Sequence, residues 1–423
     1  MLSVLYLSIS KGHPMIDLGL LRENPTKFVA EVHKKDPAFN GQELVSLEQD
    51  VRSLKQSVEQ LRSKKNELAA LAKGGITDEL REQSKQIGID LKRKDLELQE
   101  KEAAFKALYL ACPNIPFAGV PIGGKEKNEV VKVVGEKPSF DFPVKNHVEL
   151  MENLGWVDFQ AATRITASNF ALYKNDAVSL MYALTHFMLK NNRKHGFQAV
   201  LPPVMVNEKS LETSGNFPKF KDQVYAIPAD NLYLSPTSEV CLVNMYRGEI
   251  LQEDQLPIRN TAWTSCFRRE AGAYGAHERG LIRIHQFEKV ELVSLCDPNE
   301  SENELDRMLE CAENILQALG LHYRVSLLAS EDMSFQAAKT YDIEVWLPGQ
   351  KSYYEVSSAS NCTDFQARRG LIRYKKTGDS KTHLVHTLNA SSLALPRLMV
   401  ALVETYQQED GSIALPEVLQ SLM

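Results

Sequence analysis

The residues best suited to chemistry lie in one segment, Trp263 to Val293, which reads WTSCFRREAGAYGAHERGLIRIHQFEKVELV. Its two ends alternate between apolar and polar residues as strands do, and about a dozen mostly polar residues separate them, more than a hairpin turn usually has. On the second strand, the predicted apolar face consists of Ile282, Ile284, Val290 and Leu292. The opposite face carries Arg283, His285, Phe287, Lys289 and Glu291.

Arg268 and Glu270 are expected to project together from the first strand. A sheet face with two arginines, two glutamates and an aromatic ring makes a poor core and a good binding site. The alternative is a solvent-exposed face with salt bridges, which many antiparallel sheets have. The spacing alone leaves both interpretations open.

The chain around this segment contains two regions with different predicted structures, and the first is helical. No proline occurs between Pro37 and Pro113, and apolar residues recur there at alternating spacings of three and four. This repeat is typical of a coiled coil. The first run contains Leu44, Leu47, Val51, Leu54, Val58, Leu61 and Leu68, and the second contains Leu80, Ile87, Leu91, Leu98, Phe105 and Leu108. Gly74-Gly75 separates them, so residues 41–110 are predicted to form an antiparallel helical hairpin.

The predicted hairpin arm carries 13 basic and 13 acidic residues, unevenly distributed. Between Arg52 and Lys73 there are six basic residues but only two acidic ones, Glu59 and Glu67. A solvated helical face is one interpretation of such a run, and a surface that contacts phosphates is the other. The whole chain of 423 residues has a net charge of −6, which excludes a strongly basic, histone-like nucleic-acid binder but permits a local basic patch.

Beyond Pro113, short alternating strands and amphipathic helices such as 177–194 and 302–319 predict an α+β domain on a mainly antiparallel sheet. No GxGxxG or GxxxxGK[ST] motif is present, so neither familiar glycine-rich loop would hold a nucleotide. The six cysteines form no CxxC pair, which favours a reducing, cytoplasmic location. No apolar run is long enough to span a membrane. Residues 1–14 are interpreted as an extension or an upstream start, with the fold beginning near Met15.

Several segments together resemble one family. Phe267-Arg268-Arg269-Glu270 is similar to motif 2 of class II aminoacyl-tRNA synthetases, and its continuation resembles the seryl-tRNA synthetases. Thr237-Ser238-Glu239 resembles their serine-binding TxE element, and residues 339–370 resemble the strands that lead to a DFQARR signature. HTLNASSLALPR at 386–397 stands in the place of motif 3, and Gly196–Pro203 resembles motif 1, the dimer element.

The resemblance implies an ATP site in which the serine carboxylate attacks the α-phosphate. Arg268 would hold the α-phosphate, Glu270 would fix adenine or orient the arginine, and Phe287 would stack on adenine. Arg397 would cover the other face of adenine and reach the γ-phosphate. Arg269 and Arg283 are further ATP candidates, together with Glu355, Val356, Ser357 and Ser358. Of these, Glu355 and Ser358 would also hold Mg²⁺.

Strand parity puts Glu355 and Ser358 on opposite faces, so the strand must end or bulge between them. For Ser358 alone, a strand-end capping hydroxyl is the simpler interpretation. The resemblance assigns serine binding to six residues: Thr237, Ser238, Glu239, Glu291, Asn389 and Ser391. A pocket that hydrogen-bonds the substrate hydroxyl rejects an analogue that lacks it.

Motif 3 departs from the family pattern TLNGSGLAVGR, because Ala390, Ser392 and Pro396 replace glycines. The added side chains are expected to narrow the nucleotide site. Proline before Arg397 is acceptable if it opens a helix.

The implied protein is a homodimeric serine–tRNA ligase that uses ATP and Mg²⁺ and charges tRNA(Ser); whether it also charges a selenocysteine tRNA stays open. Residues 15–112 would form the tRNA-binding domain, with its arm tip at 74–75, and residues 113–423 the catalytic domain. The loop Ala271–Leu281 would meet the tRNA 3′ end. The alternatives are a ligase that loads a carrier protein, and a non-catalytic paralogue or scaffold on the same fold.

Overall fold

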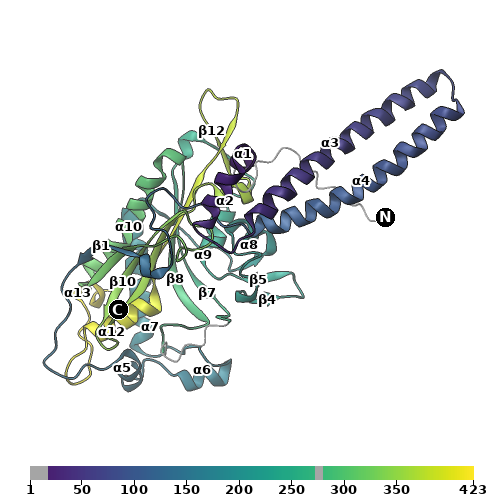
Figure 1. Cartoon of the computed structure of the whole chain (residues 1–423). Helices are drawn as coiled ribbons and strands as arrows, with labels where there is room; N and C mark the ends of the chain where they lie inside the picture. Colours follow the sequence, from purple (N-terminus) through teal and green to yellow (C-terminus); the bar gives the residue numbers. More distant parts are fainter. Residues whose placement is uncertain (1–17, 272–279) are drawn as a thin grey trace. The chain divides into compact units, whose positions relative to one another are not determined.

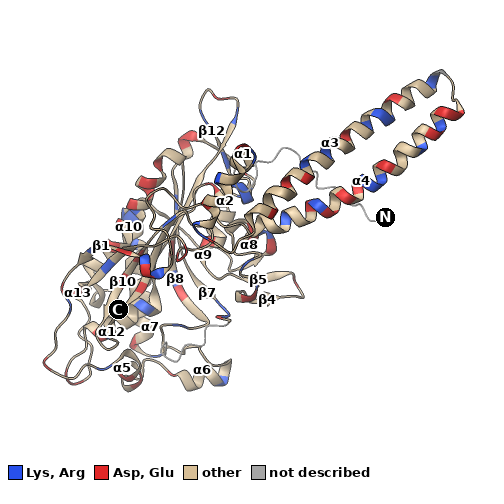
Figure 2. Ribbon diagram, in the orientation of Figure 1, with Lys and Arg blue, Asp and Glu red and all other residues tan. Residues whose placement is uncertain are grey.

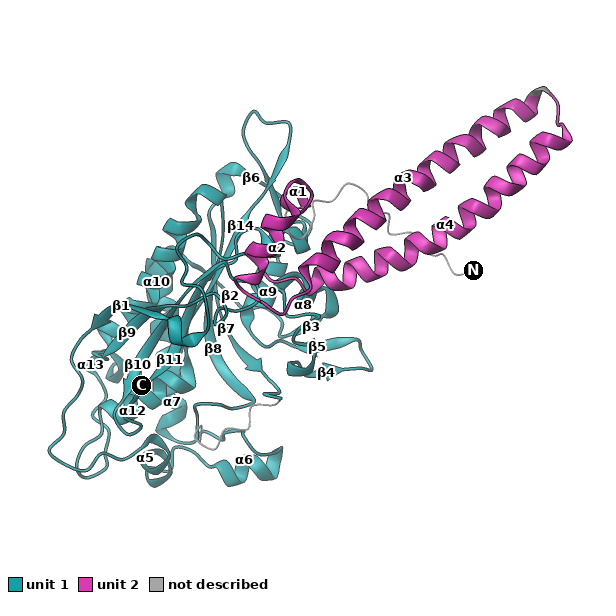
Figure 3. Cartoon of the chain, viewed as in Figure 1, with its two compact units in different colours: residues 1–14, 114–423 teal, residues 15–113 magenta. Residues whose placement is uncertain are grey.

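A computed structural model describes residues 18–271 and 280–423 (Figure 1). The predicted N-terminal extension, residues 1–14, and most of the predicted tRNA-contacting loop lie outside the described residues. The chain divides into two compact units, one of residues 15–113 and one that contains residues 114–423 (Figure 3).

The smaller unit is helical. Two short helices, α1 (Leu18–Glu23) and α2 (Pro25–His33), precede two long ones, α3 (Gly41–Leu71) and α4 (Asp78–Leu110). Asn40 caps α3 by accepting the backbone N–H of Glu43, and Thr77 caps α4 by accepting that of Leu80. The predicted helical hairpin is confirmed, although its turn is longer than a Gly-Gly pair. A 3₁₀ turn, Ala72–Gly74, and residues 75–77 connect the helices.

The two arm helices pack through the predicted seam and through ion pairs across it. Leu44, Leu47, Val51, Leu54 and Val58 of α3 are buried. Three ion pairs join α3 to α4: Lys55–Glu102, Arg62–Asp95 and Lys101–Asp50. Figure 2 shows basic and acidic residues interleaved along both helices. Each exposed pair contributes little by itself, so the buried seam supplies most of the stability of the arm.

The larger unit is built on an eight-stranded sheet in the order β1-β9-β10-β11-β14-β8-β7-β2. Among the described strands of this sheet, the β2–β7 pair alone is parallel, which confirms the predicted, mainly antiparallel α+β fold. The strands of this sheet are β1 (Glu129–Val134), β2 (Gln198–Val200), β7 (Ile258–Phe267), β8 (Gln286–Cys296), β9 (Tyr323–Leu327), β10 (Lys339–Leu347), β11 (Ser352–Asn361) and β14 (His386–Ala394).

Two small sheets and a set of helices complete the larger unit. The small sheets contain β3 (Met205–Asn207), β4 (Ala226–Ile227) and β5 (Leu232–Leu234), and β6 (Ile250–Gln252), β12 (Arg373–Lys375) and β13 (Thr382–Leu384). The helices are α5 (His147–Asn153), α6 (Phe159–Ile165), α7 (Asp176–Lys194), α8 (Glu208–Ser214), α9 (Ser238–Asn244), α10 (Ser301–Ala318), α11 (Phe365–Gly370), α12 (Leu395–Thr405) and α13 (Glu417–Gln420).

The central strand β8 separates an apolar face from a polar one. Val290 lies in the core with side chains of α7, α10 and α12, and Leu292 packs with residues of α10. The opposite face carries Lys289 and Glu291, both buried, beneath α9. The predicted alternation is therefore correct from Phe287 to Leu292.

The strand prediction is wrong at both ends of the loop. β8 begins at Gln286, so Ile282–His285 lie outside it, and the backbone N–H of His285 bonds to the carbonyl of Asn169 rather than to a neighbouring strand. β7 ends at Phe267, so Arg268 and Glu270 follow the strand instead of projecting from it. Glu270 adopts a left-handed conformation with φ of 48°.

Candidate active site

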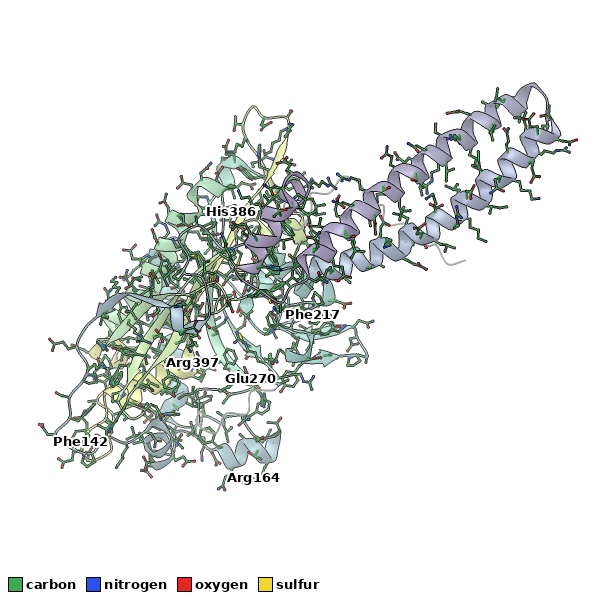
Figure 4. The ribbon with its side chains drawn as sticks, in the orientation of Figure 1. Phe142, Arg164, Phe217, Glu270, His386 and Arg397 are labelled. Atoms are coloured by element: carbon green, nitrogen blue, oxygen red, sulfur yellow. The ribbon has the colours of Figure 1, made fainter. Side chains whose placement is uncertain are left out.

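A cavity of ≈ 280 Å³ opens where β7, β8, β11, β14 and α12 meet. Two of its lining residues, Glu270 and Arg397, are labelled in Figure 4. The cavity brings together residues predicted from three separate motifs: Arg268, Glu270, Arg283, Phe287, Glu355, Val356, Ser391 and Arg397. Basic groups dominate its charged lining, so it suits an anionic ligand with an aromatic part.

Arg268 lies against Phe287 in this cavity. Its guanidinium carbon is 5.2 Å from the centre of the Phe287 ring. Its Nε donates to the carbonyl of Pro236 at 3.3 Å, and its backbone N–H bonds to the carbonyl of His285. These contacts hold the arginine at the wall of the cavity beside an aromatic ring on which a planar base can stack.

Glu270 pairs with Arg283 across the mouth of the loop. The Arg283 Nη2 lies 2.6 Å from the Glu270 Oε2. A non-glycine residue in the left-handed region costs of order 1–3 kcal/mol. In this left-handed conformation of the turn after β7, the Glu270 carboxylate lies against Arg283.

Arg397 enters the cavity from the first turn of α12. Its Nη1 donates to the carbonyl of Glu355 at 2.7 Å, and its Nε donates to that of Ile282 at 3.3 Å. Pro396 is the second residue of α12, which confirms that this proline opens a helix. Of the three residues expected to narrow the site, Pro396 is the one that lines the cavity among the described residues. Ala390 is buried with residues of α10, and Ser392 bonds to Asn192, so both point away from the cavity.

The predicted bulge in β11 exists, at Val356. In the pairing with β10, Glu355 lies opposite Glu344, and Ser357 lies opposite Ile343, so Val356 is the extra residue. The bulge restores parity and places Glu355 and Ser358 on the same face. Asp342, opposite Ser358, belongs to this group, and its buried Oδ1 has no hydrogen-bond partner among the described residues. Burial and the neighbouring Glu355 raise the pKa of Asp342 well above its usual value.

A second group of polar residues is buried next to the cavity. Thr237 caps α9, and its hydroxyl donates to the Glu291 Oε2 at 3.1 Å. Lys289 donates to the Thr237 hydroxyl at 2.8 Å and also forms an ion pair with Glu291. Glu239 accepts from the Gln366 Nε2 at 2.6 Å and from the Asn389 Nδ2 at 3.0 Å. Burial, and the nearby Glu291, raise the pKa of Glu239 to about 7.

Three predicted site residues lie apart from these two groups. The Ser238 hydroxyl bonds to Thr264 at 2.6 Å, and the Ser357 hydroxyl donates to the carbonyl of Ser391, so both are engaged within the protein. Arg269 is exposed, and its backbone N–H bonds to the carbonyl of Gln223.

Three residues join the site that the motifs did not assign to it: Lys289, Gln366 and Asp342. The sequence pattern did point to Lys289, because it alternates with Phe287 and Glu291 on the same strand face. Gln366 lies within the DFQARR signature, and Asp342 within the matching strands, but their partners lie far away in the sequence. Only the fold brings them to the site.

Two family models match the chain. Residues 15–116 match the seryl-tRNA synthetase N-terminal domain, and residues 221–406 match the tRNA synthetase class II core domain of the G, H, P, S and T enzymes. Among the described residues, no helix has the length and the apolar character needed to cross a bilayer.

Named relatives match over nearly their full length. The serine–tRNA ligase of Chlamydia abortus is 45% identical over 414 residues, which cover 96% of this chain and 97% of that protein. The serine–tRNA ligase of Desulfotalea psychrophila is 44% identical over 423 residues, covering 96% and 98%. The crystal structure of seryl-tRNA synthetase from Pyrococcus horikoshii complexed with ATP is 33% identical, with a TM-score of 0.90 and coverage of 96% and 98%.

The raised pKa of Glu239 predicts a pH-dependent stability. The folded protein holds this proton up to about pH 7, whereas an unfolded glutamate releases it near its ordinary pKa of 4.5. Stability from this group is therefore present below pH 4.5 and lost as the pH rises to 7, by about 3 kcal/mol. Glu239→Gln removes the titration, so its melting temperature should match that of the wild type near pH 4.5 and exceed it at pH 8. If the difference between the two melting temperatures were the same at every pH in this range, the raised pKa of Glu239 would be contradicted.

Proposed function

Because the chain belongs to the seryl-tRNA synthetases, we propose that the cavity and the adjoining polar pocket are where it activates serine before charging tRNA. The enzyme is a class II serine–tRNA ligase that forms seryl-adenylate from serine and ATP and transfers serine to the 3′ end of tRNA. The observation that carries the site assignment is a single cavity lined by Arg268, Phe287, Glu355 and Arg397, next to the buried carboxylates of Glu239 and Glu291.

The first step brings the serine carboxylate to the α-phosphate of ATP, so two anions must approach each other. Arg268 would neutralise this charge, because a guanidinium binds two phosphate oxygens at once. Phe287 would stack on adenine, and Arg397 would cover the other face and reach the γ-phosphate. Glu270 orients Arg283 in the structure, which supports a role for Arg283 in phosphate contact.

The residues present fit Mg²⁺ as a partner of ATP. Glu355 and Ser358 share a face because of the bulge, and the buried Asp342 Oδ1 beside them lacks a hydrogen-bond partner among the described residues. No group of three or more His, Cys, Asp or Glu side chains in those residues is arranged to hold a metal ion. Two protein ligands suit Mg²⁺, which keeps waters and phosphate oxygens as its other ligands. When bound, the ion would neutralise charge on the phosphates.

The buried polar group is proposed as the serine pocket. Its carboxylates, Glu239 and Glu291, can accept from the ammonium and hydroxyl of serine, and Ser391 and Asn389 lie beside them on β14. A smaller substrate without the hydroxyl would leave these groups unpaired, which disfavours it. Thr237 contacts both Glu291 and Lys289 and links the pocket to α9.

The arm is proposed to bind tRNA through the lysines near its tip. Of the six basic residues from Arg52 to Lys73, Arg52, Lys55 and Arg62 pair with carboxylates of the arm. Lys64, Lys65 and Lys73 form no ion pair within the described helices and are exposed. They are therefore the available phosphate contacts, and the loop at 271–281 is proposed to meet the 3′ end.

The segment Gly196–Pro203 is proposed as part of a homodimer interface. It contains the edge strand β2, which pairs with β7 on one side and ends the sheet. The next residue, Leu201, is 81% exposed. Two other large apolar side chains are also exposed: Met205, shortly after it in the chain, and Tyr182 on α7, a helix that contacts β2. An unpaired edge beside exposed apolar residues is typical of a surface that a second copy covers.

A cytoplasmic location is proposed, because tRNA is charged there and the six cysteines, all buried, form no disulfide with one another. The alternatives of a carrier-protein ligase and a non-catalytic paralogue have no support in the matched domains. Serine-dependent exchange of pyrophosphate into ATP, followed by charging of purified tRNA, tests the function directly. Normal exchange without charging would favour the carrier-protein ligase, and absence of exchange would favour the paralogue.

Arg268→Ala should lower serine-dependent ATP–pyrophosphate exchange by about 10²–10³-fold, because it removes the donor nearest to the developing charge. The melting temperature should stay close to that of the wild type, since Arg268 is exposed. Arg193→Ala, an exposed arginine at the end of α7, is the matched control and should exchange normally. Exchange within a few-fold of wild type for Arg268→Ala would refute its role.

The double variant Lys64→Ala/Lys65→Ala should weaken tRNA binding and charging while exchange stays normal. Loss of two phosphate contacts should also make the dependence of binding on salt less steep, by roughly one unit of slope for each lysine. Lys92→Ala/Lys106→Ala, also exposed on the arm, is the control. If both double variants charge tRNA equally well, the lysines near the tip are not the contact.

Leu201→Asp should shift the protein from dimer to monomer in sedimentation velocity, since a carboxylate would be buried in the interface. Ile165→Asp, on the exposed face of α6, alters an equally exposed residue and should leave the dimer intact. A wild-type protein that sediments as a monomer at micromolar concentration would reject the dimer proposal.

A further inference from the structure

Lys289 is a buried ammonium to which the sequence motifs assign no role. It lies on β8 between Phe287 and Glu291 and is 5% exposed. Lysine is among the residues least often buried, and a buried ammonium needs partners. It lines the nucleotide cavity and also contacts two residues of the proposed serine pocket, Thr237 and Glu291. Among the described residues that line the cavity, no other side chain bonds to both Thr237 and Glu291.

The contacts of Lys289 fix the direction of the hydrogen bonds around Thr237. An ammonium has donors and no lone pair, so the Thr237 hydroxyl must accept from Lys289, at 2.8 Å. The same oxygen accepts the backbone N–H of Glu239 at 3.3 Å. The single hydroxyl hydrogen is then left for the Glu291 Oε2, at 3.1 Å. Thr237 therefore has its hydroxyl hydrogen committed to Glu291.

The charges of the pocket support the same arrangement. Glu239 and Glu291 are both buried, and each would be costly as an unpaired charge. Lys289 balances one of the two carboxylates. Above about pH 7, where Glu239 is ionised, one negative charge remains, which matches the single ammonium that an amino-acid substrate brings.

We propose that Lys289 is a positioning residue for the amino-acid substrate: it holds the Thr237 hydroxyl and the Glu291 carboxylate in the arrangement that receives the serine ammonium. This inference rests on the proposed function, since it concerns the pocket where serine would bind. Lys289 acts through Thr237 and Glu291, whereas binding of ATP depends on Arg268, Phe287 and Arg397.

The test separates the Michaelis constants for the two substrates in serine-dependent ATP–pyrophosphate exchange. Lys289→Met keeps a similar volume but removes the donors. It should raise KM for serine by about tenfold or more, the effect of one lost charge-assisted hydrogen bond, while KM for ATP stays within about twofold. A merely structural lysine would change both constants together or neither. A lower KM for serine would show that Lys289 competes with the substrate ammonium, and either result would overturn the inference.

If Lys289→Met does not fold, variants of Thr237 test the same positioning role. Thr237→Val keeps the shape but removes the hydroxyl and should reproduce the rise in KM for serine alone, whereas Thr237→Ser should behave within a few-fold of wild type. The double variant Lys289→Met/Thr237→Val should lose no more than the worse single variant, because both act through one network. Additive losses, or a normal KM for serine in Thr237→Val, would refute the inference. If the wild-type enzyme shows no serine-dependent exchange, the proposed function itself is rejected. If the wild-type enzyme exchanges normally, a negative result with the variants contradicts only the role of Lys289.

Discussion

Two carboxylates buried side by side, Glu239 and Glu291, impose the main constraint on the larger unit. Each needs donors that water would otherwise supply, and each makes ionisation of the other less favourable. The donors come from distant parts of the chain: Lys289 from β8, Gln366 from α11 and Asn389 from β14. The pocket can form only if these elements pack correctly, so folding and assembly of the site are one event.

The two faces of the central sheet have different roles, and this allows the buried polar pocket to form. Val290 and Leu292 pack against helices on one face, and the resulting apolar core holds β8 in register. The alternate residues, Lys289 and Glu291, then need no packing role and can carry charge. Strand β11, separated from β8 by β14, adds Glu355 and Ser358 to the same site through its bulge. Rigid strands rather than loops therefore position most of the groups proposed for chemistry.

The sequence allowed the periodic parts of this structure to be predicted. The heptads of the arm and the alternation from Phe287 to Leu292 follow directly from helix and strand geometry. Alternation misled at Ile282–His285, where the pattern continues but the backbone bonds to Asn169 instead of to a strand. Most site residues came from the family resemblance. The alternation placed Lys289 on the polar face, but its contact with Thr237, which is remote in the sequence, was not foreseen. Gln366 and Asp342 were missed as functional residues because their partners are remote in sequence, and no local pattern encodes such contacts.

The extra residue in β11 has a consequence for how this site can change over evolution. Because strand faces alternate, removing Val356 or its equivalent would turn Glu355 to the opposite side of the sheet relative to Ser358, although neither residue would be altered. The pair therefore depends on the number of residues in the strand as much as on their identity. A paralogue could lose the arrangement through a single-codon deletion while Glu355 and Ser358 both remained in its sequence. Alignments that score identities and ignore one-residue gaps would then record the site as intact.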